Sequence, residues 1–435
     1  MKIAAILLLL AFFSPLYAFS EEINLSLNEA LVIALRDNRD ILLKEEELKK
    51  AKAKISESHA DLFPALTLSG DWTYTSGYYA KDISQTGMQV GLRQNLYTGG
   101  KTFNTIKYNG YRFEIAKALL DKAKIDTALN AKKSLLTLIL AQDFARLNKL
   151  LVDNGKEELL FIQERYKAGE VSESDVLRAE SALSELVQVY ESSLNQVSLA
   201  QAVLNNLLYL DKDVKIKAIG EFNFQGREVA FDEGLLKALE ERPEIRQYAA
   251  QIKADKSSVE IAKSGTRPNI YASWDYYSRS HAVTTTVNTR NWNDYNILGV
   301  TFSWPVFDGW RTKAKVEQAV IDLKQTQLLK EKAIKDIVLE LKDAYLGLKD
   351  AIALIKSSQT DLKFYTDNYR SASEKYKQGE LSLLDKSNAQ IKYEVSRFNH
   401  NQAGYDYTIA KANFDKATGQ EAVVWPPLVK ATGGF

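Results

Sequence analysis

The sequence predicts a mixed α/β fold that is mainly helical and is built from two similar halves. The first observation is an internal repeat: residues 165–172 (RYKAGEVS) return at 375–382 (KYKQGELS), and residues 97–101 (YTGGK) return at 307–311 (FDGWR). The second is that apolar residues recur every three or four positions over long stretches without proline, which is typical of helices. The third is a set of four short segments rich in Thr, Tyr, Trp and Ser, which favour strands. A repeat of this length exceeds the roughly 20–50 residues of solenoid units, so it predicts a duplicated half-molecule.

The composition argues against several classes of protein. The 435 residues hold 57 Lys and Arg against 56 Asp and Glu, a formal net charge of +1, so we expect no large basic surface for nucleic acid. The chain has no cysteine, which rules out disulfides, thiolate metal sites and a catalytic thiol. Its three histidines, at positions 59, 281 and 400, lie far apart in the sequence. We therefore expect no metal site, no cofactor and no enzymatic activity.

Residues 1–20 have the pattern of a secretory signal peptide. Lys2 gives the positive start and residues 3–13 form an unbroken apolar run, which is shorter than the roughly 18–20 apolar residues of a transmembrane helix. Cleavage is expected after Ala18 or after Ser20. Nothing later in the sequence resembles a membrane helix. An exported chain of this kind is either soluble or part of a β-barrel, because only helices and closed barrels satisfy every backbone group in lipid.

Each half opens with a helical stretch rich in Ala, Leu, Lys and Glu, over 27–59 and over 231–264. Pro243 is expected to begin a new helix inside the second stretch, because proline suits the first helical turn. The matching position of the first stretch predicts a break near Asn38. A proline then ends each stretch, since the residue before proline is pushed towards an extended conformation.

Four strands follow, two in each half. They are predicted at 66–75 and 87–96, as a β-hairpin over 66–96, and at 270–280 and 295–305, as a β-hairpin over 270–305. Polar loops are expected at the hairpin tips, over 76–85 and 281–292.

After each β-hairpin the apolar pattern changes to that of a coiled coil. A helix from about 101 to 167 would be about 100 Å long, would turn near Gly169 and would return from 172 to about 208. Glycine after the last helical turn, with Ser and Asp opening the next helix, is the signal for such a turn. The second half repeats this signal at Gly379. The sequence therefore predicts two long helical hairpins, with the strands at their opposite end.

These elements divide the chain into four parts. The expected parts are a signal peptide at 1–20, a first structural repeat at 21–220, a second structural repeat at 221–419 and a C-terminal tail at 420–435.

Tryptophans gather in or beside the strand segments, and we expect Trp72, Trp274, Trp292 and Trp304 to lie at a membrane interface. Strands of about ten residues with alternating character suit the wall of an outer-membrane barrel. Four strands cannot close a barrel, since the smallest has about eight, and an open edge in lipid leaves backbone groups unpaired. Several copies would therefore share one barrel, and their helical hairpins would form a tube beside it.

Two other classes of protein remain open at this point. One is an exported coiled-coil structural protein, which would not need strand hairpins joined to helix ends by glycine steps. The other is a periplasmic adaptor, which normally has one helical hairpin flanked by lipoyl-like and barrel domains. A channel would need detergent for extraction, whereas both alternatives would be soluble.

The duplicated layout, the aromatic–Asp/Thr–Gly step after each second strand and the two Tyr-x-x-Gly-x-x-Ser-x-x-Asp turns resemble the TolC-type outer-membrane efflux family. The resemblance extends from about residue 26 to residue 419. It implies a homotrimer in the outer-membrane lipid of a Gram-negative bacterium, with a twelve-stranded β-barrel of four strands per chain and a periplasmic α-barrel tunnel. It also implies a passive exit duct in a tripartite efflux or type I secretion system. The implied partners are a periplasmic adaptor (a membrane fusion protein) and, indirectly, an RND or ABC pump, while the substrate stays open between drug, metal and protein.

The resemblance also implies a gate near the helical tips, where polar links hold the entrance of the tunnel shut. By position, Asp175 of the first hairpin and Tyr376 of the second would form a charge-assisted hydrogen bond, with Ser174 beside it. Alternatively, Tyr376 packs on the last helical turn and Asp175 only favours the start of its helix. Asp385 would place three carboxylates around the axis of a trimer, which is consistent with a preference for cations.

The tips themselves are expected to contact the adaptor, through Gly169, Glu170, Val171, Gly379, Glu380 and Leu381. The sequence departs from the best-known pattern of the family at two places. Leu381 occupies the position of an arginine that helps lock the gate, and Asn388 occupies the position of a second ring of aspartates. We therefore expect a looser lock and a weaker cation trap.

Overall fold

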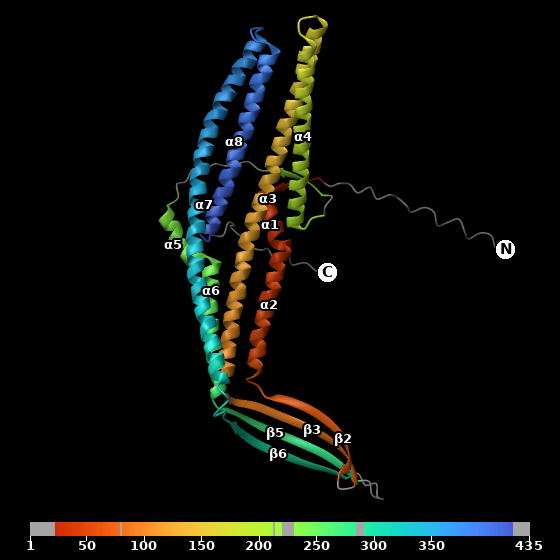
Figure 1. The fold of residues 1–435 in the computed structure, drawn as a ribbon, viewed down its shortest axis with the longest axis vertical. Helices are drawn as coiled ribbons and strands as arrows, with labels where there is room; N and C mark the ends of the chain where they lie inside the picture. The colour runs from red at the N-terminus through yellow and green to blue at the C-terminus, as the bar shows by residue number, and fades with distance from the viewer. Residues whose placement is uncertain (1–21, 79–80, 212–213, 220–229, 284–290, 421–435) are drawn as a thin grey trace, which may run out of the picture.

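The computed structural model describes residues 22–78, 81–211, 214–219, 230–283 and 291–420. The predicted signal peptide and nearly all of the predicted C-terminal tail lie outside these residues. The molecule is strongly elongated, with a sheet at one end and the tips of two helical hairpins at the other (Figure 1). The long helices run along the axis that joins these two ends.

Two helices of 67 residues each, α3 (Lys101–Lys167) and α7 (Arg311–Lys377), run from the sheet to the tips. At 1.5 Å per residue each is about 100 Å long. The returning helices, α4 (Glu173–Leu208) and α8 (Leu383–Ala417), are about half as long and end near the middle of the molecule. The predicted helical hairpins, with their turns at Gly169 and Gly379, are confirmed.

Shorter helices occupy the half of the molecule that α4 and α8 leave free. They are α1 (Leu27–Asp37) and α2 (Arg39–Ala60) in the first half, and α5 (Phe231–Glu241), α6 (Pro243–Lys263) and the 3-10 turn η1 (Ser264–Thr266) in the second. The break near Asn38 is confirmed, because the Asn38 side chain accepts a hydrogen bond of 2.9 Å from the N–H of Asp40 and caps α2. The break at Pro243 is confirmed as well, with proline as the first residue of α6.

The four predicted strands form one antiparallel sheet in the order β2-β3-β5-β6. They are β2 (Ala65–Tyr78), β3 (Lys81–Thr98), β5 (Asn269–Val283) and β6 (Asn291–Ser303). The predicted loops at 76–85 and 281–292 are too long, since backbone pairing continues to Tyr78↔Lys81 and to His281↔Asn291. Polar side chains suggested loops there, but a strand needs only backbone partners and does not end where its side chains become polar.

A second, small sheet was not predicted. Its two strands, β1 (Glu22–Ser26) and β4 (Lys215–Ile219), pair in parallel. Ile216 of β4 is 3% exposed and belongs to a core with Leu135, Leu138 and Leu204 of the long helices. A matching core of the second half centres on Leu341. Each half thus has a core of its own around the middle of the molecule.

A cluster of charged side chains joins the elements of the second half to α3. Arg242, between α5 and α6, has a side chain that is only 5% exposed. Its guanidinium donates to Glu244 over 3.1 and 3.2 Å and to Glu340 of α7 over 2.5 Å. Lys416 of α8 lies 2.8 Å from Asp126 of α3 and 3.9 Å from Glu340. Burial disfavours the charge of Arg242, but its hydrogen bonds to the two glutamates outweigh burial and raise its pKa above the ordinary value.

Candidate functional site

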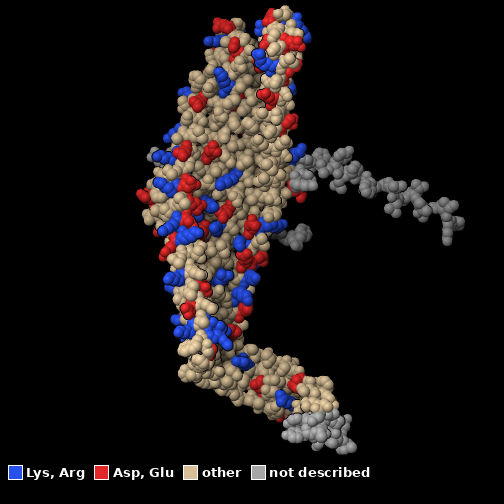
Figure 2. Space-filling view, viewed as in Figure 1, with Lys and Arg blue, Asp and Glu red and all other residues tan. Residues whose placement is uncertain are grey.

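The four-stranded sheet has one apolar and one polar face. Alternation along the strands, combined with the register, places one set of apolar side chains on the same face. This apolar face consists of Leu66, Leu68, Val90, Leu92, Trp274, Leu298, Val300 and Phe302. Leu68 is 71% exposed and Leu298 is 81% exposed. Figure 2 shows few charges over the sheet compared with the helices. Such a contiguous exposed apolar surface indicates contact with lipid or with another protein.

The opposite face carries polar side chains that bind one another. The Gln89 side chain donates to Asp275 over 2.9 Å and to the hydroxyl of Tyr277 over 3.1 Å. The ring of Tyr277 stacks on Tyr295 with centroids 5.0 Å apart, and the Arg279 guanidinium lies 5.0 Å from the same ring. A face of this kind suits water.

The tryptophans lie at different heights along the sheet. The register places Trp72 and Trp292 at the same height, near the end of the sheet that is far from the helices. Thr86 and Ser280 of the two central strands lie between them. Trp304 follows β6 at the helical end, twelve residues after Trp292. At about 3.3 Å per residue this is about 40 Å along the strand. For a strand tilted by about 40° it is roughly 30 Å, the thickness of the hydrocarbon core of a bilayer.

Trp274 lies at neither of these heights. It pairs with Leu92 and Leu298 about halfway between the two ends, in the middle of the apolar face. The three other tryptophans predicted for a membrane interface occupy the ends, as an interfacial position requires.

Both outer edges of the sheet are open. No described strand pairs with the free side of β2 or of β6. These strands have 14 and 13 residues, so each presents a long row of unpaired N–H and C=O groups. Next to an exposed apolar face, such edges are a template for pairing with further strands.

The two helical tips have the same local structure. Gly169 and Gly379 adopt left-handed backbones with φ of +76° and +78°, and their N–H groups donate to Tyr166 and Tyr376. Leu381 is half-buried, and so is Val171, whereas Glu170, Glu380 and both glycines are exposed. The predicted adaptor contacts therefore form two exposed turns at the end of the molecule (Figure 1).

The structure does not bring Asp175 and Tyr376 together within the chain. The Asp175 carboxylate accepts hydrogen bonds of 3.0 and 2.7 Å from the N–H and hydroxyl of Ser172, and these bonds lower its pKa. The ring of Tyr376 instead lies 5.0 Å from the ammonium group of Lys386. Ser174 is exposed on the first turn of α4.

Asp385 repeats the arrangement of Asp175 at the second tip. Its carboxylate accepts a hydrogen bond of 2.6 Å from the hydroxyl of Ser382, which in turn accepts from the N–H of Asp385. Both aspartates thus secure the start of a helix and remain at the surface. The second carboxylate oxygen of Asp175 lies 3.6 Å from the guanidinium of Arg178, and this exposed ion pair leaves it accessible to a partner outside the chain.

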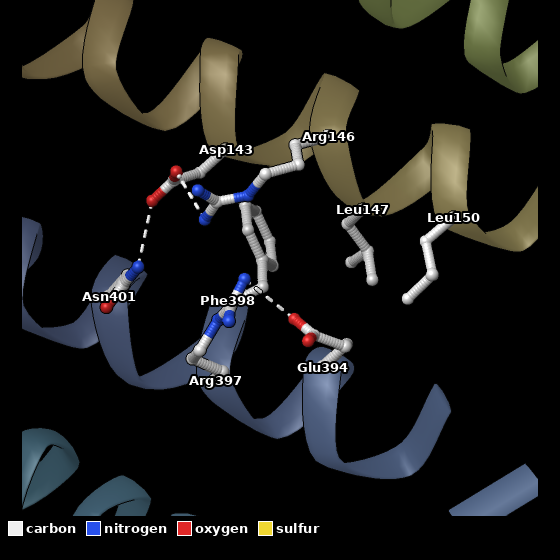
Figure 3. A pocket seen from close by; sticks show the side chains of 8 residues that line it. All are labelled: Asp143, Arg146, Leu147, Leu150, Glu394, Arg397, Phe398 and Asn401. Atoms are coloured by element: carbon white, nitrogen blue, oxygen red, sulfur yellow. Dashed lines mark hydrogen bonds and ion pairs between the residues drawn. The ribbon is translucent and has the colours of Figure 1, made fainter. Parts of the chain in front are cut away.

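A groove of about 220 Å³ lies between α3 and α8, where the two helical hairpins meet (Figure 3). The Asp143 carboxylate binds Arg146 over 2.8 Å and accepts from Asn401 over 2.8 Å, while Arg397 pairs with Glu394. The ring of Phe398 contacts Phe144 on α3, with centroids 5.4 Å apart. Since every charged group that lines the groove is paired, we interpret it as a helix–helix contact and not as a ligand site. Residues more than 230 positions apart form this contact, so the sequence could not indicate it.

Among the described residues, no group of three or more His, Asp or Glu side chains is placed to hold a metal ion. The described helices include none that is long and apolar enough to cross a membrane.

Both the sequence and the fold of this chain have counterparts among known proteins. The sequence model of the outer membrane efflux protein family matches residues 30–208 and 235–420. A relative is the probable outer membrane lipoprotein SilC of Salmonella typhimurium, 24% identical over 387 residues, which cover 87% of this chain and 81% of SilC. The outer membrane protein TolC of Escherichia coli (strain K12) is 21% identical over 406 residues, covering 87% of this chain and 80% of TolC.

The fold is similar to that of solved channels. The Campylobacter jejuni CmeC outer membrane channel superposes with a TM-score of 0.74 at 18% identity, covering 91% of this chain and 87% of CmeC. The two family segments correspond to the two halves of the fold, and the region between them includes β4.

Proposed function

The chain belongs to the outer membrane efflux protein family, and from that premise we propose that three copies assemble into one channel. It is an efflux channel component of the outer membrane. In the proposed homotrimer, β2 of each copy pairs with β6 of the next and closes a twelve-stranded barrel. The observation that carries this proposal is the sheet with one exposed apolar face and two free edges. In lipid, every one of those edge groups needs a partner.

The helices support the same arrangement. Within one chain α3 contacts α8, whereas α4 and α7 contact no further helical hairpin on their outer sides. Both carry exposed apolar side chains along their length, among them Val187 and Leu194 of α4 and Leu339 and Leu346 of α7. Packing α4 of one copy against α7 of the next would bury these side chains and close a helical tunnel below the barrel.

Cysteine cross-linking tests this assembly, because the natural chain has no cysteine. One cysteine on β2, at Thr67, is combined with single cysteines at successive positions along β6. We expect disulfide-linked dimers and trimers for only one position on β6, the one that lies opposite the cysteine at Thr67 of the neighbouring copy. Cysteines on the central strands β3 and β5 of different copies are the control and should give none. A purified protein that stays monomeric and soluble without detergent would contradict the proposal and favour a structural or adaptor protein.

We propose further that the tips form the gate and the docking surface of the tunnel. In the trimer the Asp175 oxygen that faces Arg178 would accept from the hydroxyl of Tyr376, and Ser174 would lie beside this link. Asp385 would form a ring of three carboxylates. Leu381 offers no charge to such a lock, which supports a gate that opens readily. The exposed tip turns would bind a periplasmic adaptor that connects the tunnel to an RND or ABC pump.

Single-channel conductance in planar bilayers tests the gate. Tyr376→Phe removes only the hydroxyl and should raise the conductance. Asp175→Ala should do so as well, although it also removes the cap of α4. Glu173→Ala, an exposed carboxylate two residues away that binds no described residue, is the control and should leave the conductance unchanged. If the tyrosine variant conducts like the unaltered protein, this link is not the gate.

A further inference from the structure

Trp310 has an unusual backbone conformation at the junction of sheet and helices. Its φ is +67°, in the left-handed region, and the only other described non-glycine residue there is Tyr209. The matching position of the first half is Gly100, with φ +84°. A tryptophan in this region carries a steric cost that glycine does not. Burial does not compensate for it, since the Trp310 side chain is 68% exposed.

The neighbours of Trp310 continue the apolar face of the sheet towards the helices. Trp304, Val306 and Phe307 are all exposed, and the ring of Phe307 meets that of Trp310 edge-on with centroids 5.9 Å apart. Amphipathic rings gather where an apolar layer meets water. Trp310 therefore lies where a bilayer that surrounds the sheet would end.

Positive charge adjoins this aromatic patch. Lys313 is exposed and forms no ion pair with a described residue, whereas Arg311 and Lys315 lie together on the opposite side of α7. The Lys313 ammonium lies 5.4 Å from the centroid of the Trp310 ring. The nearby carboxylate, Asp308, is already held by the N–H of Thr312 at 2.9 Å and by its hydroxyl. In the first half, Phe103 occupies the place of Lys313, so only the second half has this combination.

We propose that Trp310 and Lys313 form a binding site for the headgroup of an anionic phospholipid. The Trp310 ring would lie at the boundary between acyl chains and headgroups, and Lys313 would bind the phosphate. An amphiphile with a negative head fits a surface that is apolar on one side and positive on the other. This inference rests on the proposed placement of the sheet in a bilayer. It gives the strained tryptophan a role that Gly100 lacks.

The test uses the full-length trimer in a zwitterionic detergent, titrated with short-chain phosphatidylglycerol or phosphatidylcholine, with bound lipid counted by native mass spectrometry. The unaltered protein should prefer phosphatidylglycerol, and inorganic phosphate should not displace it. Lys313→Gln should lower the affinity for phosphatidylglycerol about fivefold, the effect of one lysine near an anionic lipid surface. Lys377→Gln, at the other end of the same helix, is the matched control and should bind like the unaltered protein.

Trp310→Asn separates a lipid contact from a structural role, because asparagine tolerates the left-handed region. Binding of both lipids should weaken, while the unfolding midpoint should stay the same or rise. Equal affinity for the two lipids, or a Lys313 variant that binds like the unaltered protein, overturns the proposal. So does a Trp310 variant that is less stable but binds lipid normally. The trimer band and the conductance are measured on the same samples. If the unaltered protein shows neither a trimer band nor conductance, the proposed channel is refuted. If it shows both but binds the two lipids equally, only this lipid site is refuted.

Discussion

Replacing Arg242 by methionine should destabilise the protein much more than the same change at Arg246, four residues further along α6. Methionine keeps most of the apolar stem of arginine and removes the charge and its donors. At Arg242 it removes three charge-assisted hydrogen bonds, to Glu244 and Glu340. At Arg246 it removes one hydrogen bond of 2.9 Å, to Asp121.

The expected magnitudes follow from burial. The side chains of Arg242 and Glu244 are 5% and 15% exposed, so the variant leaves a carboxylate without its main partner in a poorly hydrated place. Removing one partner of a buried ion pair costs roughly 3–5 kcal/mol. Lys122 lies 3.5 Å from Glu244 and compensates in part, which favours the lower end of this range. The Arg246 pair is 48% and 29% exposed, and exposed pairs are worth about 0–1 kcal/mol.

Urea unfolding of the detergent-solubilised protein, followed by far-UV circular dichroism, measures the difference. The midpoint of Arg242→Met should fall at least three times as far as that of Arg246→Met, with unchanged slopes. Equal shifts of the two midpoints would refute the argument that burial makes the Arg242 cluster important.

Three further changes have expected outcomes. Gly99→Ala places a Cβ 2.8 Å from the Cβ of Arg267, at a residue whose φ is +65°, so the urea midpoint of this variant should fall clearly. Gly110→Ala is the control: its Cβ would have no atom within 4 Å, so the variant should be neutral or stabilising. Asn38→Ala removes the cap of α2 and should cost about 1 kcal/mol in the same measurement; no change would mean that the cap is dispensable. Burial raises the pKa of Asp415, an effect that Lys411 and Lys132 partly offset. A carboxyl group with a raised folded-state pKa contributes stability that is complete below its unfolded value near 3.8 and is lost as pH rises through the folded value. Asp415→Asn should therefore flatten the fall of Tm with rising pH just above pH 4, and an unchanged profile would contradict the assignment.

The helical hairpins could be predicted because their signals are local. Glycine at the tips and the long proline-free stretches fix where α3 and α7 begin and end. The four strands could be predicted from their composition, but not their full length, because pairing at the hairpin tips depends on backbone geometry.

Contacts between distant parts of the chain could not be predicted. Five-residue strands such as β1 and β4 carry too little pattern to be recognised, and Glu340 meets Arg242 only through the fold. The left-handed Trp310 also escaped notice, since a glycine is the residue expected at such a position. The residues proposed for the gate lie at the predicted tips, but the resemblance had suggested a direct link that the single chain does not make.

The unequal lengths of the helices have a mechanical consequence. Because α4 and α8 end near the middle of the molecule, and α2 and α6 begin there, α3 and α7 are the only described helices that pass that level without interruption (Figure 1). These two helices are therefore the continuous covalent connection between the tips and the sheet. The shorter helices meet at this level through side-chain contacts, such as the 3.4 Å hydrogen bond from Asn38 to the carbonyl of Leu207, and not through a continuous backbone. In the proposed trimer the tunnel would therefore bend at this level if its tip-side half widened.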